Sequence, residues 1–336
     1  MATIPALSYQ DYTVGWICAL STELTAAMAM LDEEHLPLEQ HAQDNNTYTL
    51  GRIGEHNVVI ACLPAGQMGN NSAAMVATQM QYSFRAIRFG LMVGIGGGVP
   101  SEEHDIRLGD IVASNPGKHD GGVIQYDFGR TVAEGRFVRT GTLNAPPTVL
   151  LTAVNTLKAR HDLRGHRLTH HISAMEKSME KSMFKSNYAY QGAENDVLFK
   201  AEYDHVGGDR NCDQCAKSEL VSRPDRDGTD PVIHYGTIAS GNQVMRHGGT
   251  RERWGREAEV MCFEMEAAGL MNTFPCLVIR GICDYADSHK NERWQGYAAA
   301  TAAAYAKELL SIIPRTQVVG IHTMRKITTR AGKLVI

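Results

Sequence analysis

The chain has 336 residues, 43% hydrophobic and 21% charged, so it is long and apolar enough to bury a large core. Lys and Arg total 33 against 37 Asp and Glu, and this formal charge of -4 gives no reason to expect nucleic acid or a membrane surface as a partner. Residues 1–12 carry no basic region followed by an apolar run, and no eighteen apolar residues occur in succession. We therefore expect a cytoplasmic protein.

Apolar runs alternate with helical patterns along most of the chain. Strands are predicted over 12–20, 47–53, 57–63, 89–100, 110–114, 123–127, 232–240, 260–263 and 275–284, with 47–63 spaced as a hairpin. Helices are predicted from residue 21 to about 34 and over 72–84, 148–160, 265–273 and 295–313. This alternation predicts a single α/β domain over 1–314 with a central buried sheet.

Two segments interrupt this alternation. Residues 161–230 are polar and predict an insertion on the rim of the domain, in which Met175, Met179 and Met183 recur every four residues, as on one face of a solvated helix. Residues 315–336 are basic and follow Pro314, which indicates a tail or linker. We expect no chemistry in that tail.

Acidic residues follow three of the predicted strands. Glu23 comes after the first strand, Glu264 and Glu266 lie within Phe263-Glu264-Met265-Glu266-Ala267, and Asp284 closes the run that begins at Leu277. Ligands of open α/β sheets bind at such strand ends. A buried carboxylate needs a partner or a task, because desolvating an unpaired charge costs several kcal/mol.

Cleavage of a purine N-glycosidic bond needs groups of this kind. Positive charge develops on the ribose and negative charge on the leaving base, so the site requires an acid at the base, anchors for the sugar hydroxyls and a base that activates water. The alternative is structural: Glu23 as a first-turn acid favoured by the helix dipole, and Asp284 as a helix cap.

Four stretches in order resemble the nucleoside phosphorylase and nucleosidase superfamily, in its branch with methylthioadenosine/S-adenosylhomocysteine nucleosidase and the purine nucleoside phosphorylase-like domains of fungal proteins. They are Ala19-Leu20-Ser21-Thr22-Glu23, Val93-Gly94-Ile95-Gly96-Gly97, Glu264-Met265-Glu266-Ala267 and Ile282-Cys283-Asp284-Tyr285-Ala286-Asp287. The resemblance implies a twisted central mixed sheet flanked by helices, and a homo-oligomer.

The resemblance also implies roles for the acidic residues. The glutamate that matches Glu23 orients or deprotonates the attacking water, the one that matches Glu266 holds ribose hydroxyls, and the aspartate that matches Asp284 protonates N7 of the purine. We therefore predict Asp284 and Glu23 as catalytic residues. The predicted substrate-binding residues are Glu264, Glu266, Met265, Ile95, Gly96, Gly97, Asn242, Gln243 and Val244.

The nucleophile is predicted to be water. The hexameric phosphorylases of this superfamily hold phosphate with arginines at about the places where this chain has Glu23 and Met92, and a carboxylate would repel the anion. Backbone N–H groups of Gly96–Gly98 still offer an anion site, so a phosphate-dependent phosphorylase is the alternative.

The substrate is left open between adenine nucleosides and nucleotides. Ile95 and Val244 depart from the serine and the aromatic residue of methylthioadenosine enzymes, and the amides of Asn242 and Gln243 either read a purine edge or cap a loop. Arg107, Lys118, His119, Arg130, Arg136 and Arg139 suit a 5'-phosphorylated substrate such as AMP or ATP, or else form a solvated basic face. Related domains in immune-type proteins cleave ATP, and a non-catalytic nucleotide-sensing module is a further alternative.

The cysteines do not predict a disulfide framework, since most of the seven lie in apolar runs. Cys212 and Cys215 form half of a zinc site with His205 nearby, but a closed tetrahedral site needs two more ligands at suitable spacing. We therefore predict neither a metal nor a cofactor, and the expected partner is a small purine nucleoside or nucleotide.

Overall fold

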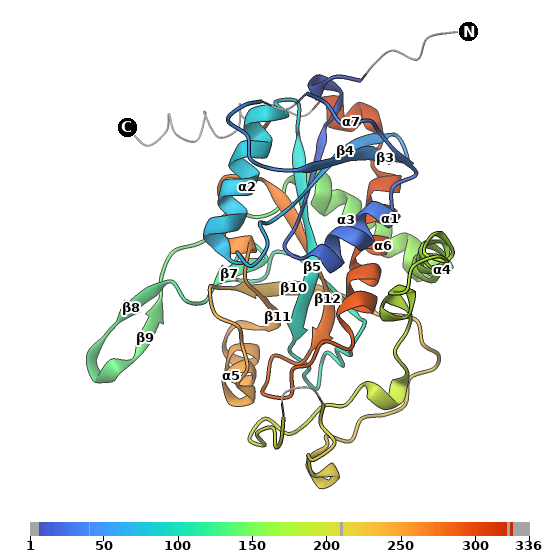
Figure 1. Cartoon of the computed structure of the whole chain (residues 1–336). Helices are drawn as coiled ribbons and strands as arrows, with labels where there is room; N and C mark the ends of the chain where they lie inside the picture. Colours follow the sequence, from blue (N-terminus) through green and yellow to red (C-terminus); the bar gives the residue numbers. More distant parts are fainter. Residues whose placement is uncertain (1–6, 40, 209–210, 321–322, 325–336) are drawn as a thin grey trace.

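A computed structural model of the chain describes residues 7–39, 41–208, 211–320 and 323–324. It has a central mixed sheet flanked by helices (Figure 1), so the predicted α/β class is confirmed. The strands within these ranges are β1 (Val14–Cys18), β2 (Glu33–Glu34), β3 (Tyr48–Ile53), β4 (His56–Cys62), β5 (Phe89–Gly98), β6 (Ile111–Ser114), β7 (Val123–Gln125), β8 (Gly129–Thr131), β9 (Phe137–Arg139), β10 (Ile233–Ser240), β11 (Val260–Glu264) and β12 (Cys276–Asp284).

The main sheet follows the order β11-β10-β6-β12-β5-β1-β4-β3-β2, with β7 paired to β10. Strand β5 is parallel to both β1 and β12, so the carboxyl ends of these three strands lie at one edge. The glycines at the end of β5 also pair with β11, Gly97 with Phe263 and Gly98 with Cys262. This extra pairing curls the sheet and brings the end of β11 to the same edge.

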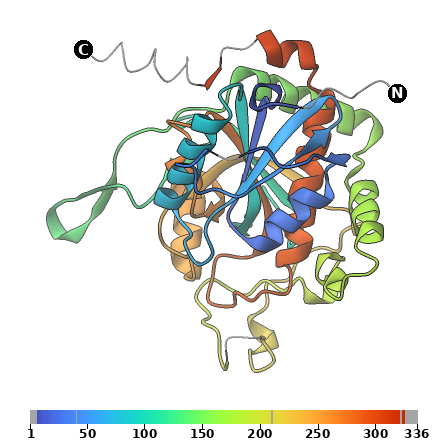
Figure 2. The same ribbon diagram turned by 45° about the horizontal axis from the view of Figure 1, so that its top comes forward.

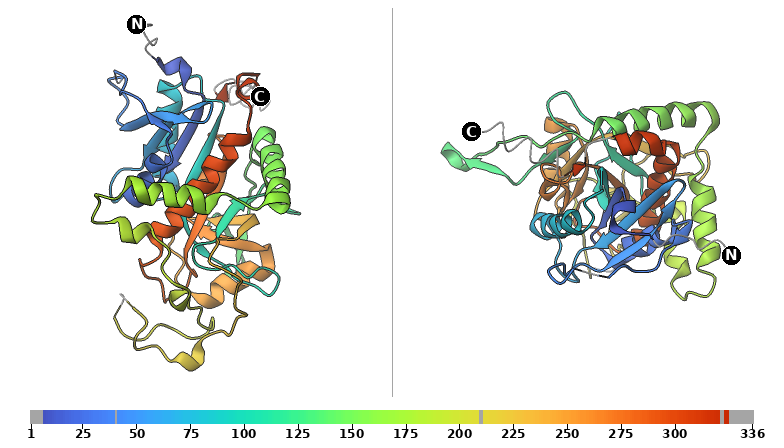
Figure 3. Two further views of the ribbon diagram at one scale, coloured as in Figure 1. Left: turned by 90° about the vertical axis from the view of Figure 1, so that its right-hand side faces the viewer. Right: turned by 90° about the horizontal axis from the view of Figure 1, so that it is seen from above.

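The helices are α1 (Ser21–Ala29), α2 (Asn70–Ser83), α3 (Thr148–Arg164), α4 (Leu168–Ser178), α5 (Gly248–Ala258), α6 (Gln295–Ile312) and α7 (Arg315–Gly320). Alanine-rich α6 is buried along nearly its whole length because it packs on β12 and β5 and is in turn covered by α3 and α4. Figures 2 and 3 show α2 on the opposite side of the sheet from α6. No helix within the described ranges combines the length and apolar character needed to cross a lipid bilayer.

Several predicted boundaries were wrong. The first helix ends at Ala29, since residues 33–34 turn back as β2 against β3. The helix expected over 265–273 is only a 3-10 turn, Ala267–Gly269, because this segment bends directly after β11. The methionine repeat does not form one continuous helix: α4 ends at Ser178, and Met183 is exposed.

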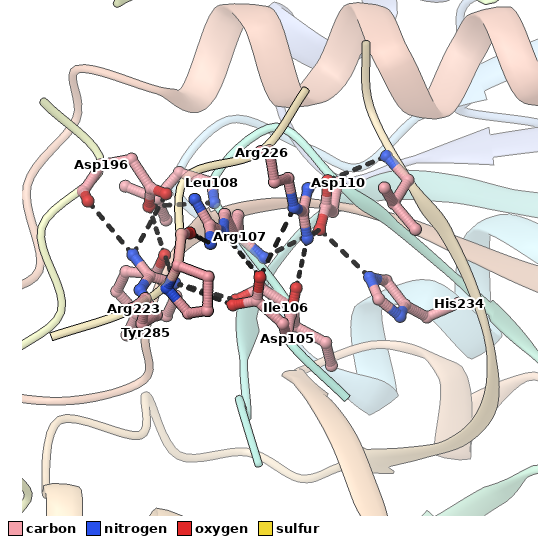
Figure 4. Close-up of polar contacts among 12 residues, drawn as sticks. Asp105, Ile106, Arg107, Leu108, Asp110, Asp196, Arg223, Arg226, His234 and Tyr285 are labelled. Carbon is pink, nitrogen blue, oxygen red and sulfur yellow. Dashed lines mark hydrogen bonds and ion pairs between the residues drawn. The ribbon is translucent and has the colours of Figure 1, made fainter. Parts of the chain in front are cut away.

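Ion pairs tie the polar insertion to the sheet (Figure 4). Arg226 binds the buried Asp110 carboxylate through Nη1 at 2.7 Å and Nη2 at 2.8 Å, while His234 of β10 lies 3.1 Å from the same group. Arg223 binds Asp196 at 3.1 Å and the Tyr285 hydroxyl at 2.9 Å. The insertion therefore packs beside the segment that directly follows Asp284, the last residue of β12.

Candidate active site

A cavity of about 330 Å³ lies at the edge of the sheet where β1, β5, β11 and β12 end. This volume falls within the roughly 300–1,000 Å³ of small-molecule sites. Glu23, in the first turn of α1, lines it together with Glu264 at the end of β11 and Asp284 at the end of β12. Glu266 completes a set of four buried acidic side chains, and the exposed Glu292 also lines the cavity.

The Arg280 guanidinium, from the middle of β12, joins three of these carboxylates. It hydrogen-bonds Glu264, lies 3.3 Å from Oε2 of Glu266 and 3.9 Å from Oε1 of Glu23, and is fully buried. Burial of an unpaired charge costs several kcal/mol, and Arg280 supplies the compensating charge that this carboxylate cluster requires. Three carboxylates facing one guanidinium nevertheless leave the cluster short of positive charge.

Backbone N–H groups satisfy the remaining carboxylate oxygens. Glu23 accepts hydrogen bonds from the N–H groups of Ala19 at 2.6 Å, Leu20 at 3.0 Å and Ile95 at 2.8 Å. Glu266 accepts one from Gly69 at 3.2 Å. These contacts fix both side chains at the cavity wall.

Burial raises the pKa of the Glu23 carboxyl, and Arg280 and the backbone donors only partly oppose this effect. Burial also raises the pKa of Glu266. The charge of Arg280 opposes this shift, and the neighbouring carboxylates of Glu264 and Glu23 reinforce it. Carboxyl groups with raised pKa values are suited to accept a proton near neutral pH. The electrostatics therefore agree with a base at Glu23.

The pKa of Asp284 is shifted in the opposite direction, below its ordinary value. Its Oδ2 lies 2.7 Å from Nζ of Lys290, and its Oδ1 accepts the Ala286 N–H at 2.9 Å. Burial favours the neutral acid, but the Lys290 ammonium and these hydrogen bonds outweigh it, so the pKa of Asp284 lies below its ordinary value. The group that the superfamily resemblance assigns as proton donor is thus a carboxylate paired with an ammonium ion.

The glycines of β5 permit this convergence. A Cβ on Gly97 would lie 2.7 Å from Oδ1 of Asp284 and 2.9 Å from Cβ of Ala286. One on Gly96 would lie 2.5 Å from Sγ of Cys262. The glycine run therefore continues strand β5 to Gly98 and gives room for packed side chains.

The structure brings most of the predicted binding residues to this cavity. Ile95, Gly96, Gly97, Gln243, Val244 and Met265 line it. Asn242 does not line it, because its side-chain oxygen accepts the N–H of Asn70 at 3.0 Å, at the start of α2. That contact matches the capping alternative for this amide.

Arg280 and Lys290 are not predicted from the sequence. The signal for Arg280 is a charge inside an otherwise apolar strand, which requires a buried counter-charge. Lys290 lies in the polar segment after β12 and carries no comparable signal. Of the basic residues considered for a phosphorylated substrate, Arg107 binds Asp105 and Lys118 binds Glu259, and neither lines the cavity.

A second hollow of about 1,200 Å³ adjoins the cavity and shares Lys290, Glu292 and Gln295 with it. Arg246 and Arg293 also line it, with Ser21 and Thr22 from the start of α1. These residues surround the second hollow with hydroxyl groups and an excess of positive charge.

Known proteins that are similar to this chain include nucleosidases. No protein-family model matches the chain. A nucleotide-binding leucine-rich repeat (NLR)-like protein of Hyaloscypha variabilis is 51% identical over 310 residues, which are 92% of this chain but 30% of that protein. The 5'-methylthioadenosine/S-adenosylhomocysteine nucleosidase of Mycobacterium bovis is 26% identical over 310 residues, 90% of this chain and 97% of its own length.

Solved structures show the same fold. The 5'-methylthioadenosine/S-adenosylhomocysteine nucleosidase of S. pneumoniae, solved with a transition-state inhibitor, superposes with a TM-score of 0.56 at 18% identity, covering 90% of this chain and 100% of that one. The superfamily resemblance predicted from the sequence motifs is confirmed.

We predict that Gly97→Ala disturbs the site. The new methyl group must push Asp284 or Ala286 away, which should destabilise the fold by about 1–3 kcal/mol and reduce any turnover that depends on Asp284. Thermal unfolding and an activity assay measure the two effects. Gly208→Ala is the control, since a Cβ there meets no atom of the described residues within 4 Å; equal behaviour of the two variants would contradict the packing described.

Proposed function

We propose that this chain, a member of the nucleoside phosphorylase and nucleosidase superfamily, hydrolyses the N-glycosidic bond of an adenine nucleotide such as AMP or ATP. The observation that carries the proposal is the convergence of Glu23, Glu266 and Asp284 on one cavity. The names of the nucleosidase relatives support the reaction class.

In the proposed reaction, water adds to the anomeric carbon as the bond to the purine breaks. Glu23 takes a proton from the water, and its raised pKa suits it to do so. The ribose hydroxyls lie against Glu266, and the carboxylates that exceed Arg280 in charge stabilise positive charge on the sugar.

The leaving purine takes the bonding electrons and a proton at N7. Asp284 faces N7: the Lys290 ammonium transfers a proton to the Asp284 carboxylate, which passes it on to N7, and Lys290 is left as a neutral amine until solvent reprotonates it. The ion pair therefore supplies a proton even though the pKa of Asp284 is low. Lys290 acts through Asp284 as a positioning and proton-supplying residue.

Water is favoured over phosphate as the nucleophile by the charge of the cavity. Two unit charges of one sign at 4 Å repel by about 4 kcal/mol in an effective dielectric of about 20. Glu23 and Glu266 lie where phosphate would have to approach, and Arg280 is already bound by three carboxylates. A phosphorylase is therefore the second candidate.

The adjoining hollow supports a 5'-phosphorylated substrate. With the base at Asp284 and the ribose at Glu266, the 5' end of the sugar points toward Arg246 and Arg293 in this proposal. Guanidinium groups and the hydroxyls of Ser21 and Thr22 are suitable partners for phosphate oxygens.

Self-association belongs to the same proposal. Met75 and Tyr82 are exposed on α2, seven residues apart and therefore on one face of the helix, and exposed Met68 lies just before it. Met68 also lines the cavity. An apolar face of this kind suits a contact between two copies of the chain.

Replacement of Asp284 by Asn tests catalysis itself. The amide cannot relay a proton, so release of free adenine should fall by about a hundred- to ten-thousand-fold, with thermal unfolding little changed. Asp162→Asn, at an exposed position on α3, is the matched control. A wild-type protein that binds nucleotide but releases no base would instead support a sensing module.

Product analysis tests the nucleophile and the substrate. Adenosine, inosine, methylthioadenosine, AMP and ATP are incubated with and without phosphate, and free base and sugar are separated by chromatography. We expect release from AMP or ATP without phosphate, faster than from adenosine, and a loss of about tenfold for the nucleotides alone in Arg246→Gln/Arg293→Gln. Strict dependence on phosphate with ribose 1-phosphate as product would establish the phosphorylase instead.

Replacement of Lys290 by Met tests the proton supply. Without the ammonium, the pKa of Asp284 rises, because burial is then opposed only by the Ala286 N–H and the Cys283 thiol. The variant therefore carries a proton on Asp284 below that raised pKa, but above it the carboxylate has no ammonium ion to supply one. We expect kcat/KM near the wild-type value at pH 5 but about a hundredfold lower at pH 8. Lys307→Met is the control, because Lys307 pairs with Asp32 away from the cavity; a profile parallel to the wild type would remove Lys290 from the mechanism.

A further inference from the structure

The insertion contains a cluster of metal-binding side chains outside the cavity. His205, Cys212 and Cys215 each offer one ligand atom, and these atoms lie within 4.8 Å of one another. Both cysteines are free, and Cys215 is buried. Two thiols and an imidazole at this spacing are characteristic of structural zinc sites, in which the Cys-x-x-Cys pair supplies half of a tetrahedron.

The hydrogen bonding of His205 leaves one ring nitrogen available to a metal. Its Nε2 lies 2.8 Å from the carbonyl oxygen of Asn211. A carbonyl only accepts, so Nε2 carries the proton and Nδ1 keeps its lone pair. Metal-bound histidines commonly donate their second N–H to a carbonyl in this manner.

His289 lies beside this group; its ring nitrogens are not among the atoms within 4.8 Å of one another, so it completes the set only when its ring moves toward the other three ligands. It is buried, and within the described part of the chain neither of its ring nitrogens makes a hydrogen bond. Nδ1 has a carboxylate nearby, but Nε2 has no polar partner among the described residues, and a buried ring nitrogen in this state calls for an explanation. Its ring centroid lies 5.4 Å from that of His205, close to the roughly 5 Å expected for two imidazoles on one tetrahedral zinc with Zn–N bonds of about 2.0–2.1 Å.

Neighbouring groups orient the His289 ring. It stacks on Phe199 with centroids 4.0 Å apart, and its Nδ1 lies 3.5 Å from Oδ1 of Asp287. Arg251 in turn holds Asp287 at 3.0 Å. A carboxylate beside Nδ1 directs Nε2 toward the metal, which is the usual carboxylate–histidine–zinc arrangement.

We propose that His205, Cys212, Cys215 and His289 bind one Zn²⁺ ion. The site joins two segments that are distant in the sequence: the insertion, which supplies three ligands, and the segment after β12, which supplies His289. His205 is already linked to this second segment, because its backbone N–H donates to Oγ of Ser288 at 3.0 Å. The ion therefore fastens the insertion to the segment that contains Asp284 and Lys290.

Metal analysis of the full chain tests the site without reference to catalysis. The protein is incubated with ZnCl₂, passed over a desalting column and assayed by mass spectrometry for bound metal. We expect about one zinc per chain in the wild type and less than about a tenth of that in Cys212→Ser/Cys215→Ser. His289→Ala should bind zinc more weakly than the wild type, and a chelator should lower Tm of the wild type but not of the double variant.

Cys62→Ser and His119→Ala are the controls, because Cys62 and His119 lie outside the cluster and should leave zinc content unchanged. The Co²⁺ form of the wild type should show tetrahedral absorption with a thiolate charge-transfer band, which the double cysteine variant lacks. A wild type that retains no zinc, retention equal in the double variant, or a Cys212–Cys215 disulfide under the same conditions would overturn the proposal. Retention by His289→Ala equal to that of the wild type would overturn the four-ligand site.

Discussion

The cavity depends on one buried interaction, the contact of the Arg280 guanidinium with Glu23, Glu264 and Glu266. These side chains come from β12, α1 and the end of β11, and like charges at such distances would push the three segments apart. Removing one partner of a buried ion pair typically costs about 3–5 kcal/mol, since the other charge stays in the interior. Arg280 thus holds the three segments together, and it is the cation shared by all three carboxylates. The negative charge that it leaves unbalanced would attract a cationic sugar and repel a phosphate anion.

The curled sheet makes that interaction possible. β5 runs parallel to β1 and β12 and then pairs with β11 through Gly97 and Gly98, which closes one side of the sheet on itself. Side chains at these positions would collide with Asp284 or with Ile282. The glycines therefore act through packing: they allow four strand ends to meet, and the cavity forms where those ends leave space.

The sequence predicts these features unevenly, for physical reasons. Hydrophobic periodicity predicts most strands and α6, because burial requires that pattern, and acidic residues at strand ends are conspicuous against apolar neighbours such as those around Glu264. Hydrophobic periodicity does not predict α5 (Gly248–Ala258), because this polar helix buries only Gly248 and Arg251. Nor does it predict Lys290, because its importance arises only from the 2.7 Å contact with Asp284. Pairings between distant segments are properties of the fold, which local patterns do not contain.

The end of β12 and the residues that follow it contact the cavity, the insertion and α5. Asp284 faces the cavity, Tyr285 receives a hydrogen bond from Arg223 of the insertion, and Asp287 is held by Arg251 of α5. Ala286 adopts a left-handed conformation with φ of 51°, which is unfavourable for a residue with a side chain. The N–H of Ala286 donates a hydrogen bond to Oδ1 of Asp284, so the strained turn fixes the carboxylate. The contacts of Tyr285 and Asp287 on either side of Ala286 offset the strain. Because Arg223 and Arg251 come from the insertion and from α5, residues outside the four stretches that carry the superfamily resemblance help to fix the position of the proposed proton donor.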